Sequence, residues 1–282
     1  FPGRPAAGGG AGWRAALALA FALAASAGPI PPAMAAPPQP PGAPARGSSD
    51  DAQRLRRFTG AMVRIEARAI DGAASAESLG RDRVGSGVII RPGLVLTTGY
   101  LLLETEQVEV TSTSGRRVPA TVAGYDHASG FGLVRTVLPL DGQPLPLGDS
   151  DQVAERQVLL TQGQGEPHAT RLLVVSRRPF SGDWEYLIER PIYTFPPVKN
   201  WSGSALMTSD WPLVGIGPLI WGRAAGGAPG LPGNLFVPVN LLKPIIEELL
   251  ADGRRRGPAQ PWLGMATEAV RGHLIVSRVS RE

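Results

Sequence analysis

The 282-residue sequence contains no cysteine, and only Lys199 and Lys243 among its 28 basic residues are lysines. The lack of cysteine excludes a disulfide framework, a thiol nucleophile and a cysteine-ligated zinc site. It does not identify the compartment, because a domain of this size can be exported without disulfides. The positive charge of the chain is therefore carried almost entirely by arginine.

The excess of positive charge is also small once the N-terminal segment is counted separately. Residues 1–47 hold three arginines and no acidic residue, whereas the remainder has 25 basic against 24 acidic residues. A basic face for nucleic acid would need an excess of positive charge within the folded part. The sequence therefore predicts no nucleic-acid partner.

No apolar run near the N-terminus is long enough to span a membrane, which takes about 20 residues. Arg14 precedes eleven small or apolar residues at 15–25, and a small-residue pattern follows at Ala33-Met34-Ala35. These features predict a secretory signal peptide over residues 1–36, cleaved after Ala35 or nearby, and an exported protein of the periplasm or cell envelope. An alanine-rich tail or an uncleaved anchor are the alternatives. Residues 37–53, Pro-rich and then polar, are predicted to form a linker.

Apolar residues make up 43 % of the chain, enough for one substantial core and a small second module. After a helical turn around Arg54–Phe58, short apolar segments recur at spacings near ten residues, which favours an all-β barrel or sandwich. The predicted strands lie at 62–67, 88–90, 94–96, 108–110, 133–134, 158–160, 172–175 and 213–216.

One helix is predicted to close this body. Apolar residues from Leu242 to Leu250 follow helical spacing, with Asn240 as the expected cap and Gly253 as the stop. Residues 254–261 are then predicted to be a linker. The segments at 262–265 and 273–279 resemble the first strands of another module, which is too short here for a core of its own.

Several stretches, in order, resemble the HtrA/Deg family of serine proteases. They are Gly85–Ile90 with Leu94–Thr98, Ala123–Val134, Leu145–Ser150, Asn200–Leu206, Phe236–Asn240 with the helix, and Trp262–Met265. The resemblance covers roughly residues 55–282. It implies a trypsin-like double antiparallel β-barrel with a C-terminal helix over residues 54–253, followed by the truncated start of a PDZ domain at 262–282. It also implies serine endopeptidase ancestry, no cofactor and a homotrimer.

The catalytic positions depart from the family pattern. Tyr100 stands at the family's histidine position and Gly130 at its aspartate position, while Ser202 keeps the nucleophile. The oxyanion loop would comprise Asn200, Trp201 and Ser202, with Asn200 in place of the usual glycine. Two of the three triad positions therefore lack the family's residue.

This pattern leaves the serine without an evident base. A tyrosine with a pKa near 10 is only about one-thousandth phenolate at pH 7, and glycine has no carboxylate with which to orient a partner. The simplest interpretation makes Tyr100 a core-facing aromatic that fills the place of the histidine. We therefore expect a pseudoprotease that binds unfolded polypeptides or peptide C-termini; the alternative is an active endopeptidase in which His127 or Lys199 serves as base.

Other polar features point to no additional site. His127, His168 and His273 share no ligand spacing, so no metal site is predicted. The run Arg254-Arg255-Arg256 is expected to be a solvated cluster at the end of the helix.

The segment Trp262, Leu263, Gly264 and Met265 resembles the carboxylate-binding loop of PDZ domains, which would bind peptide C-termini. The alternative is an ordinary strand start that Trp262 anchors by packing.

Overall fold

The computed structural model describes residues 46–166, 168–181, 187–199, 202–222, 224, 232–257, 265–270 and 273–279. The predicted signal peptide lies outside these residues. None of the helices in this part of the chain is long and apolar enough to cross a membrane.

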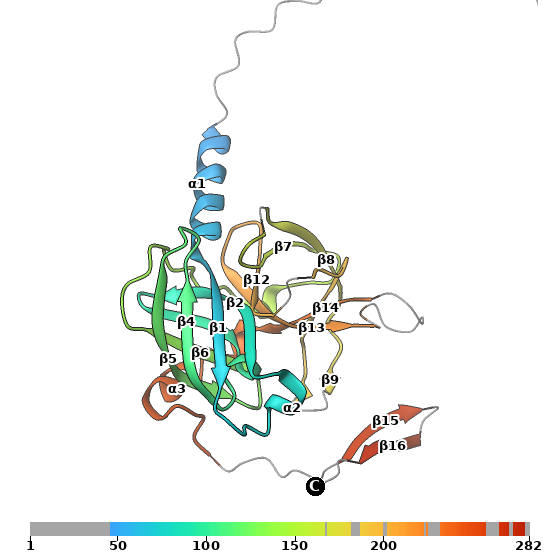
Figure 1. The fold of residues 1–282 in the computed structure, drawn as a ribbon. Coiled ribbons are helices and arrows are strands. Elements are labelled where there is room, and N and C mark those ends of the chain that lie inside the picture. Colours follow the sequence, from blue (N-terminus) through green and yellow to red (C-terminus); the bar gives the residue numbers. More distant parts are fainter. Residues whose placement is uncertain are drawn as a thin grey trace, which may run out of the picture. The chain divides into compact units, whose positions relative to one another are not determined.

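Two closed antiparallel barrels of six strands form the body, and they confirm the predicted all-β double barrel (Figure 1). The first barrel has the strand order β1-β2-β3-β6-β5-β4, and the second has the order β11-β14-β13-β12-β7-β8. The first comprises β1 Met62–Ala69, β2 Asp82–Arg91, β3 Leu94–Thr98, β4 Thr105–Thr111, β5 Arg117–Asp126 and β6 Phe131–Thr136. The second comprises β7 Val158–Gln162, β8 Thr170–Ser176, β11 Ile192–Phe195, β12 Ser204–Met207, β13 Leu213–Trp221 and β14 Gly233–Pro238.

Shorter elements connect and flank the barrels. The helices are α1 Arg46–Ala61, α2 Ala76–Leu79 and α3 Ile246–Asp252, and the 3₁₀ turns are η1 Gly99–Leu102, η2 Ser150–Gln152 and η3 Val239–Leu241. Two further strand pairs are β9 Phe180–Ser181 with β10 Leu187–Ile188, and β15 Met265–Val270 with β16 His273–Val279. The assignment of the β15–β16 hairpin to a PDZ domain stays a prediction.

Period-two alternation explains how the first barrel fills. In β1, Val63, Ile65 and Ala67 are buried inside, while Arg64 and Glu66 face outward. Side chains from alternate positions suffice to fill a barrel of this size, so no channel is left. The second barrel encloses its own apolar cluster, which includes Leu159, Leu172 and Phe236.

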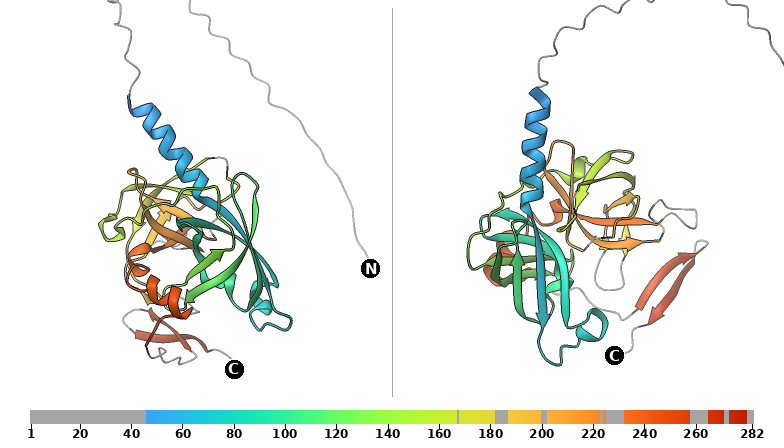
Figure 2. Two further views of the ribbon diagram at one scale, coloured as in Figure 1. Left: turned by 90° about the vertical axis from the view of Figure 1, so that its left-hand side faces the viewer. Right: turned by 45° about the horizontal axis from the view of Figure 1, so that its top comes forward.

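A third and larger apolar cluster joins residues of both barrels. It combines Leu96 and Phe131 of the first barrel with Met207 and Leu213 of the second. The segment between the barrels follows the same boundary, where Leu145 N donates to Ile89 O at 2.9 Å. Figure 2 shows the two strand groups beside each other. This shared core holds the predicted site residues of the first barrel near Ser202 in the second.

Helix α1 is longer than the sequence predicts. A linker was expected up to residue 53 and a single turn around Arg54–Phe58, but one helix runs from Arg46 to Ala61. Phe58 is fully buried in the cluster between the barrels. Because most helical stability in proteins comes from packing of one face, this long-range contact explains a helix that local composition does not predict.

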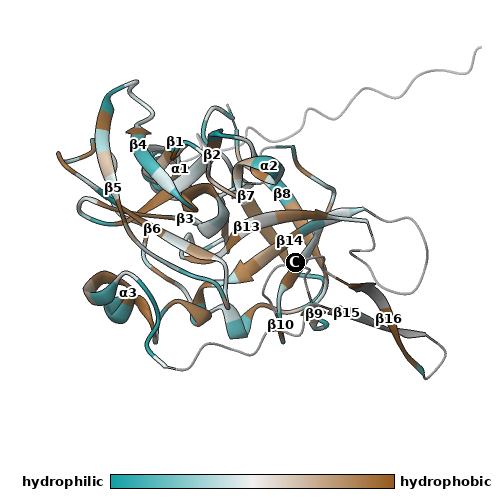
Figure 3. Cartoon of the chain, turned by 60° about the horizontal axis from the view of Figure 1, so that its bottom comes forward, coloured by the Kyte–Doolittle hydropathy of each residue, from teal (hydrophilic) through white to brown (hydrophobic). Residues whose placement is uncertain are grey.

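The C-terminal helix begins later than predicted, and Asn240 does not cap it. The Asn240 amide donates to Asp149 Oδ1 at 2.6 Å and to Asp151 Oδ2 at 2.8 Å. The Asn240 side chain thus forms hydrogen bonds with the segment between the barrels, and α3 starts only at Ile246. Gly253 ends the helix in the left-handed conformation with φ 71°, as predicted. Figure 3 shows both polar and apolar residues on α3, whose Leu249 is buried.

Candidate active site

The 3₁₀ turn η1 places Tyr100 directly after strand β3. A buried arginine, Arg83 of β2, holds this turn by donating to Tyr100 O at 3.1 Å and to Leu103 O at 2.6 Å. Arg83 is only 4 % exposed, and its guanidinium also donates to Gly80 O and to Ser75 Oγ. The backbone of Tyr100 is therefore fixed by a fork of charge-assisted hydrogen bonds.

Gly130 occupies a tight turn between β5 and β6. Its φ is 74°, a conformation that side chains rarely adopt, and its amide donates to Asp126 O at 2.8 Å. Gly99 N donates to Gly130 O at 2.7 Å, so the turns at the histidine and aspartate positions are joined through their backbones. The geometry of the first barrel is thus retained without the carboxylate.

Asp126, the nearest acidic residue in sequence, does not replace that carboxylate. It is 4 % exposed, and its Oδ2 accepts from Ser129 N at 3.0 Å, from Ser129 Oγ at 2.6 Å and from Arg255 Nη2 at 3.1 Å. Three donors converge on this one oxygen. The carboxylate therefore has a structural role in the β5–β6 turn.

Ser202 lies in the turn that precedes β12 of the second barrel. Its carbonyl oxygen accepts from Ser86 N of the first barrel at 2.8 Å. Gly203 follows with φ 74°, and a Cβ there would lie 1.8 Å from Ser86 O. Only glycine fits at this position, because the turn presses directly against strand β2.

Tyr100 and Ser202 meet across the two barrels. The Tyr100 hydroxyl donates a hydrogen bond to Ser202 Oγ at 2.5 Å. Burial raises the pKa of Tyr100 above its ordinary value, and this effect exceeds the opposing effects of the hydroxyls of Ser202 and Thr98. The phenol is therefore neutral at physiological pH and acts as a donor. Tyr100 packs against the apolar cluster of the first barrel, as expected, but it is only half-buried and its hydroxyl reaches Ser202.

A cavity of about 240 Å³ opens beside Ser202. Both barrels contribute to its wall, which includes Arg64, Gly85, Ser86, Gln164, Lys199 and Ser202. Gln164 N donates to Ser86 Oγ at 2.9 Å and links the two sides. The site is thus a small polar hollow at the barrel junction.

The two alternative bases differ in their placement. Lys199 is exposed and lines the same cavity as Ser202. His127 is exposed in the β5–β6 turn, where its ring packs edge-on against Tyr125 with centroids 4.7 Å apart. In the described part of the chain neither residue has a hydrogen bond to Ser202.

The remaining predicted site residues fall largely outside the described residues. This applies to Asn200 and Trp201 of the oxyanion loop and to Trp262, Leu263 and Gly264 of the peptide-binding segment. Met265 is described, and it begins β15 with its side chain exposed. The described residues contain no group of three or more side chains that could hold a metal ion.

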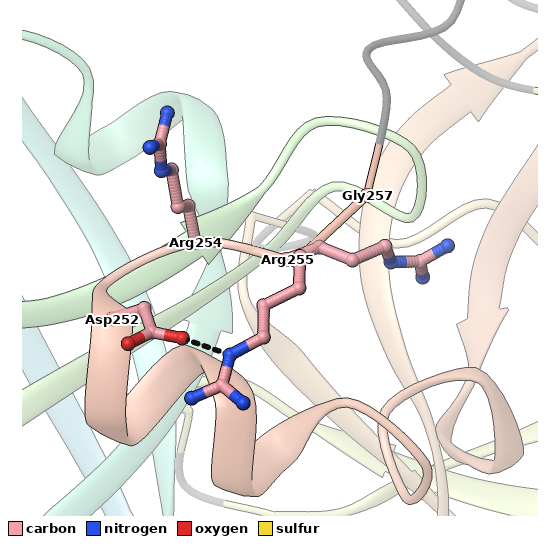
Figure 4. Close-up of a pocket in the computed structure, with 5 residues that line it drawn as sticks. Asp252, Arg254, Arg255 and Gly257 are labelled. Carbon is pink, nitrogen blue, oxygen red and sulfur yellow. Dashed lines mark hydrogen bonds and ion pairs between the residues drawn. The ribbon is translucent and has the colours of Figure 1, made fainter.

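The arginine run after α3 lines a second hollow, shown in Figure 4, and two of its three members pair with carboxylates of the chain. Arg256 pairs with Asp252, and Arg255 pairs with Asp126. Arg254 points away from Asp252 in Figure 4. All three arginines are exposed, as expected for a solvated cluster.

Arg83 is the functional residue that the sequence analysis missed. It lies in β2 on the same side of the strand as Gly85, Gly87 and Ile89, because alternate residues share a face. That parity already places a charged residue on the inner face of the first barrel. An arginine buried in such a strand indicates that its guanidinium donates hydrogen bonds to nearby backbone carbonyls and so clamps the backbone.

The matching family is described as the trypsin-like peptidase domain, and its model covers residues 85–216 of this chain. Among curated relatives, a probable periplasmic serine endoprotease, DegP-like, of Halomonas elongata is 26 % identical over 213 residues, which is 72 % of this chain and 42 % of the relative. The serine endoprotease DegS of Haemophilus influenzae is 25 % identical over 209 residues, 71 % of this chain and 60 % of the relative. The periplasmic pH-dependent serine endoprotease DegQ of Escherichia coli is 26 % identical over 180 residues, 62 % and 39 % respectively. The chain thus spans less than two thirds of the length of each.

Solved structures agree with this result at the level of the fold. The HtrA-type protease AlgW with a tripeptide is similar with a TM-score of 0.58 and 22 % identity, over 82 % of this chain and 77 % of that chain. AlgW with a decapeptide gives a TM-score of 0.55 and 19 % identity, over 82 % and 80 %. Together, the peptidase-domain match, the named serine endoproteases and the shared double barrel show that the chain is similar to HtrA-type, trypsin-like serine proteases.

Proposed function

We propose that this chain is an HtrA-type pseudoprotease, which binds polypeptide in the serine protease cleft without cleaving it efficiently. The observation that carries the proposal is the hydrogen bond from Tyr100 to Ser202 Oγ. In this family of reactions the serine hydroxyl must give its proton to a neighbouring base as it attacks. Here the neighbouring phenol donates a hydrogen bond to the serine oxygen instead and takes no proton from it.

The other described residues of the site do not replace the missing base. Burial holds the pKa of Tyr100 above its ordinary value, so phenolate is scarcer than in a free tyrosine. Gly130 offers no carboxylate to orient a base, and Asp126 is occupied by Ser129 and Arg255. Loss of the members of a triad lowers the rate by roughly 10⁴–10⁶. We therefore expect turnover too slow to serve as a protease.

Binding does not need the triad. The double barrel, the turn at Ser202 and the cavity beside it are all present, so a polypeptide segment can be bound although it is not cut. Unfolded polypeptides and peptide C-termini are the proposed ligands, and the segment from Trp262 to Met265 is the proposed second contact. The relatives named periplasmic support export of this chain, and a homotrimer is the proposed assembly.

The test uses the full chain, an unfolded protein substrate and a fluorophosphonate probe, which reacts with activated serines. We expect neither cleavage nor labelling in the unmodified chain or in Ser202→Ala, although both bind the unfolded substrate. Ser78→Ala, at an exposed serine, is the matched control. Cleavage that Ser202→Ala abolishes and Ser78→Ala does not would overturn the proposal.

An active endopeptidase with Lys199 as base is the second candidate. It is favoured over one with His127 because Lys199 lines the same cavity as Ser202, whereas His127 packs against Tyr125. A lysine can serve as base when its pKa is lowered by removal from water. If this candidate holds, Lys199→Met abolishes cleavage and fluorophosphonate labelling, while Lys243→Met leaves both unchanged.

A further inference from the structure

The cavity beside Ser202 has an unusual charge composition. Two of its lining residues, Arg64 and Lys199, are cationic, and none of the described residues that line it is acidic. Lys199 is exposed and has no ion pair in the described part of the chain. Its ammonium group therefore brings an uncompensated positive charge to the barrel junction.

Arg64 can bind a ligand together with Lys199, because the acidic partner of Arg64 is shared with another arginine. Arg64 Nη2 lies 3.2 Å from Glu66 Oε1, and the other oxygen of Glu66 pairs with Arg117. The Arg64 side chain is 42 % exposed, and an ion pair at such a site contributes little to stability. Arg117 would keep Glu66 compensated if Arg64 turned toward a ligand.

Ser202 supplies a third donor. Its Oγ accepts a hydrogen bond from the Tyr100 hydroxyl, so its own O–H must point elsewhere. That O–H has no acceptor in the described part of the chain, and Ser202 lines the cavity. Among the described residues, the Ser202 hydroxyl has no hydrogen-bonded base that would make it a nucleophile, but it can still donate a hydrogen bond into the cavity.

We propose that this cavity is a carboxylate-binding site in which Lys199, Arg64 and the Ser202 hydroxyl bind an acidic group of a polypeptide. The inference rests on the proposed function and specifies its ligand. The volume of about 240 Å³ lies below the roughly 300–1,000 Å³ of sites for whole cofactors or drug-sized molecules, so it suits one side chain or one chain end. Val84, half-exposed at the edge of the cavity, offers apolar contact to the neighbouring residue of the ligand.

The test measures binding of three fluorescent heptapeptides of alanine to the full chain. The first is blocked at both ends and has one central glutamate; the second has glutamine there instead. The third is blocked only at its N-terminus and carries no acidic side chain, so it tests the C-terminal carboxylate. We expect the glutamate peptide or the free-carboxylate peptide, or both, to bind better than the glutamine peptide. Which of them does so identifies the source of the carboxylate.

Matched variants assign the binding to this cavity. Lys199→Met should weaken binding of the peptides that carry a free carboxylate by roughly fivefold, as expected for one exposed ion pair. It should leave binding of the glutamine peptide unchanged. Arg64→Gln should act in the same direction, and Ser202→Ala should remove a smaller part of the binding. Lys243→Met, at the other lysine, is the control without effect. Raising the salt from about 0.1 M to about 1 M shortens the screening length from ~10 Å to ~3 Å. It should therefore weaken binding only of the peptides that carry a free carboxylate.

Equal binding of all three peptides, or an unchanged affinity in Lys199→Met, would overturn the carboxylate site. The proposed function fails by a different result, namely peptide or protein cleavage that depends on Ser202, which mass spectrometry of the same samples detects. Binding of an unfolded protein that is insensitive to acidic residues would refute this site alone.

Discussion

The hydroxyl of Tyr100 lies 2.5 Å from Ser202 Oγ and donates to it, which joins the first barrel to the nucleophile turn of the second. In a serine protease triad the base accepts a hydrogen bond from the serine hydroxyl. On the proposed assignment of Tyr100 to the position of the base, the contact is kept and its direction is reversed. This reversal has consequences for stability, for reactivity and for pH dependence.

Tyr100→Phe removes the donor and keeps the ring. We expect a loss of about 1 kcal/mol in the free energy of unfolding, the ordinary value of one intramolecular hydrogen bond, and no labelling by fluorophosphonate, because phenylalanine supplies no base. Urea denaturation measures the first effect. Tyr125→Phe is the control, since the Tyr125 hydroxyl has no hydrogen bond in the described part of the chain. Labelling of Tyr100→Phe would show that the tyrosine blocks an otherwise active serine.

Restoration of both missing partners, Tyr100→His with Gly130→Asp, should return fluorophosphonate labelling that neither single variant shows. The structure adds a cost, because Gly130 has φ 74° and a side chain in that conformation destabilises the fold by about 1–2 kcal/mol. We therefore expect lower thermal stability in every variant that carries Gly130→Asp. A double variant that folds, by circular dichroism, and still fails to label would contradict this prediction.

Arg83→Met should destabilise the protein by at least about 2 kcal/mol. The change removes the donor from the carbonyls of Gly80, Tyr100 and Leu103, whose hydrogen bonds to Arg83 are part-buried, and an unsatisfied buried group costs roughly 1–3 kcal/mol. Arg83→Lys should recover only part of this loss, since an ammonium group cannot reproduce the planar fork. Urea denaturation checks both variants against Arg56→Met, at an exposed arginine of α1. Equal stability of Arg83→Met and Arg56→Met would refute the clamp.

The raised pKa of Tyr100 predicts a pH dependence of stability in alkaline solution. Burial disfavours the phenolate in the folded state, whereas the unfolded chain ionises near the ordinary value of about 10. The contribution is thus fully present below about pH 10 and is lost as pH rises from there through the folded pKa. Denaturant titrations above pH 10 should show a shallower fall for Tyr100→Phe than for the unmodified chain. Tyr193, whose pKa burial also raises, remains in both proteins and cancels in the comparison.

Alternation such as that from Met62 to Ala67, with one buried face, was sufficient for an all-β barrel or sandwich, and the family resemblance of the sequence specified the double barrel. The sequence also predicted the stop of α3 at Gly253, where a left-handed residue is needed. It failed for α1 and for the start of α3, because packing of Phe58 and the side-chain bonds of Asn240 to Asp149 and Asp151 are contacts between distant segments. Local patterns carry no information about such partners.

For the site, the sequence by itself determined which groups are present: a serine, a tyrosine and a glycine where a triad would stand, and a single lysine nearby. Only the tertiary structure decided what these groups do to one another. The barrel junction brings Tyr100 within hydrogen-bond reach of Ser202 although 102 positions separate them in sequence. Burial then keeps the phenol protonated, so its scarcity as a base follows from the environment of the tyrosine and not from its identity alone.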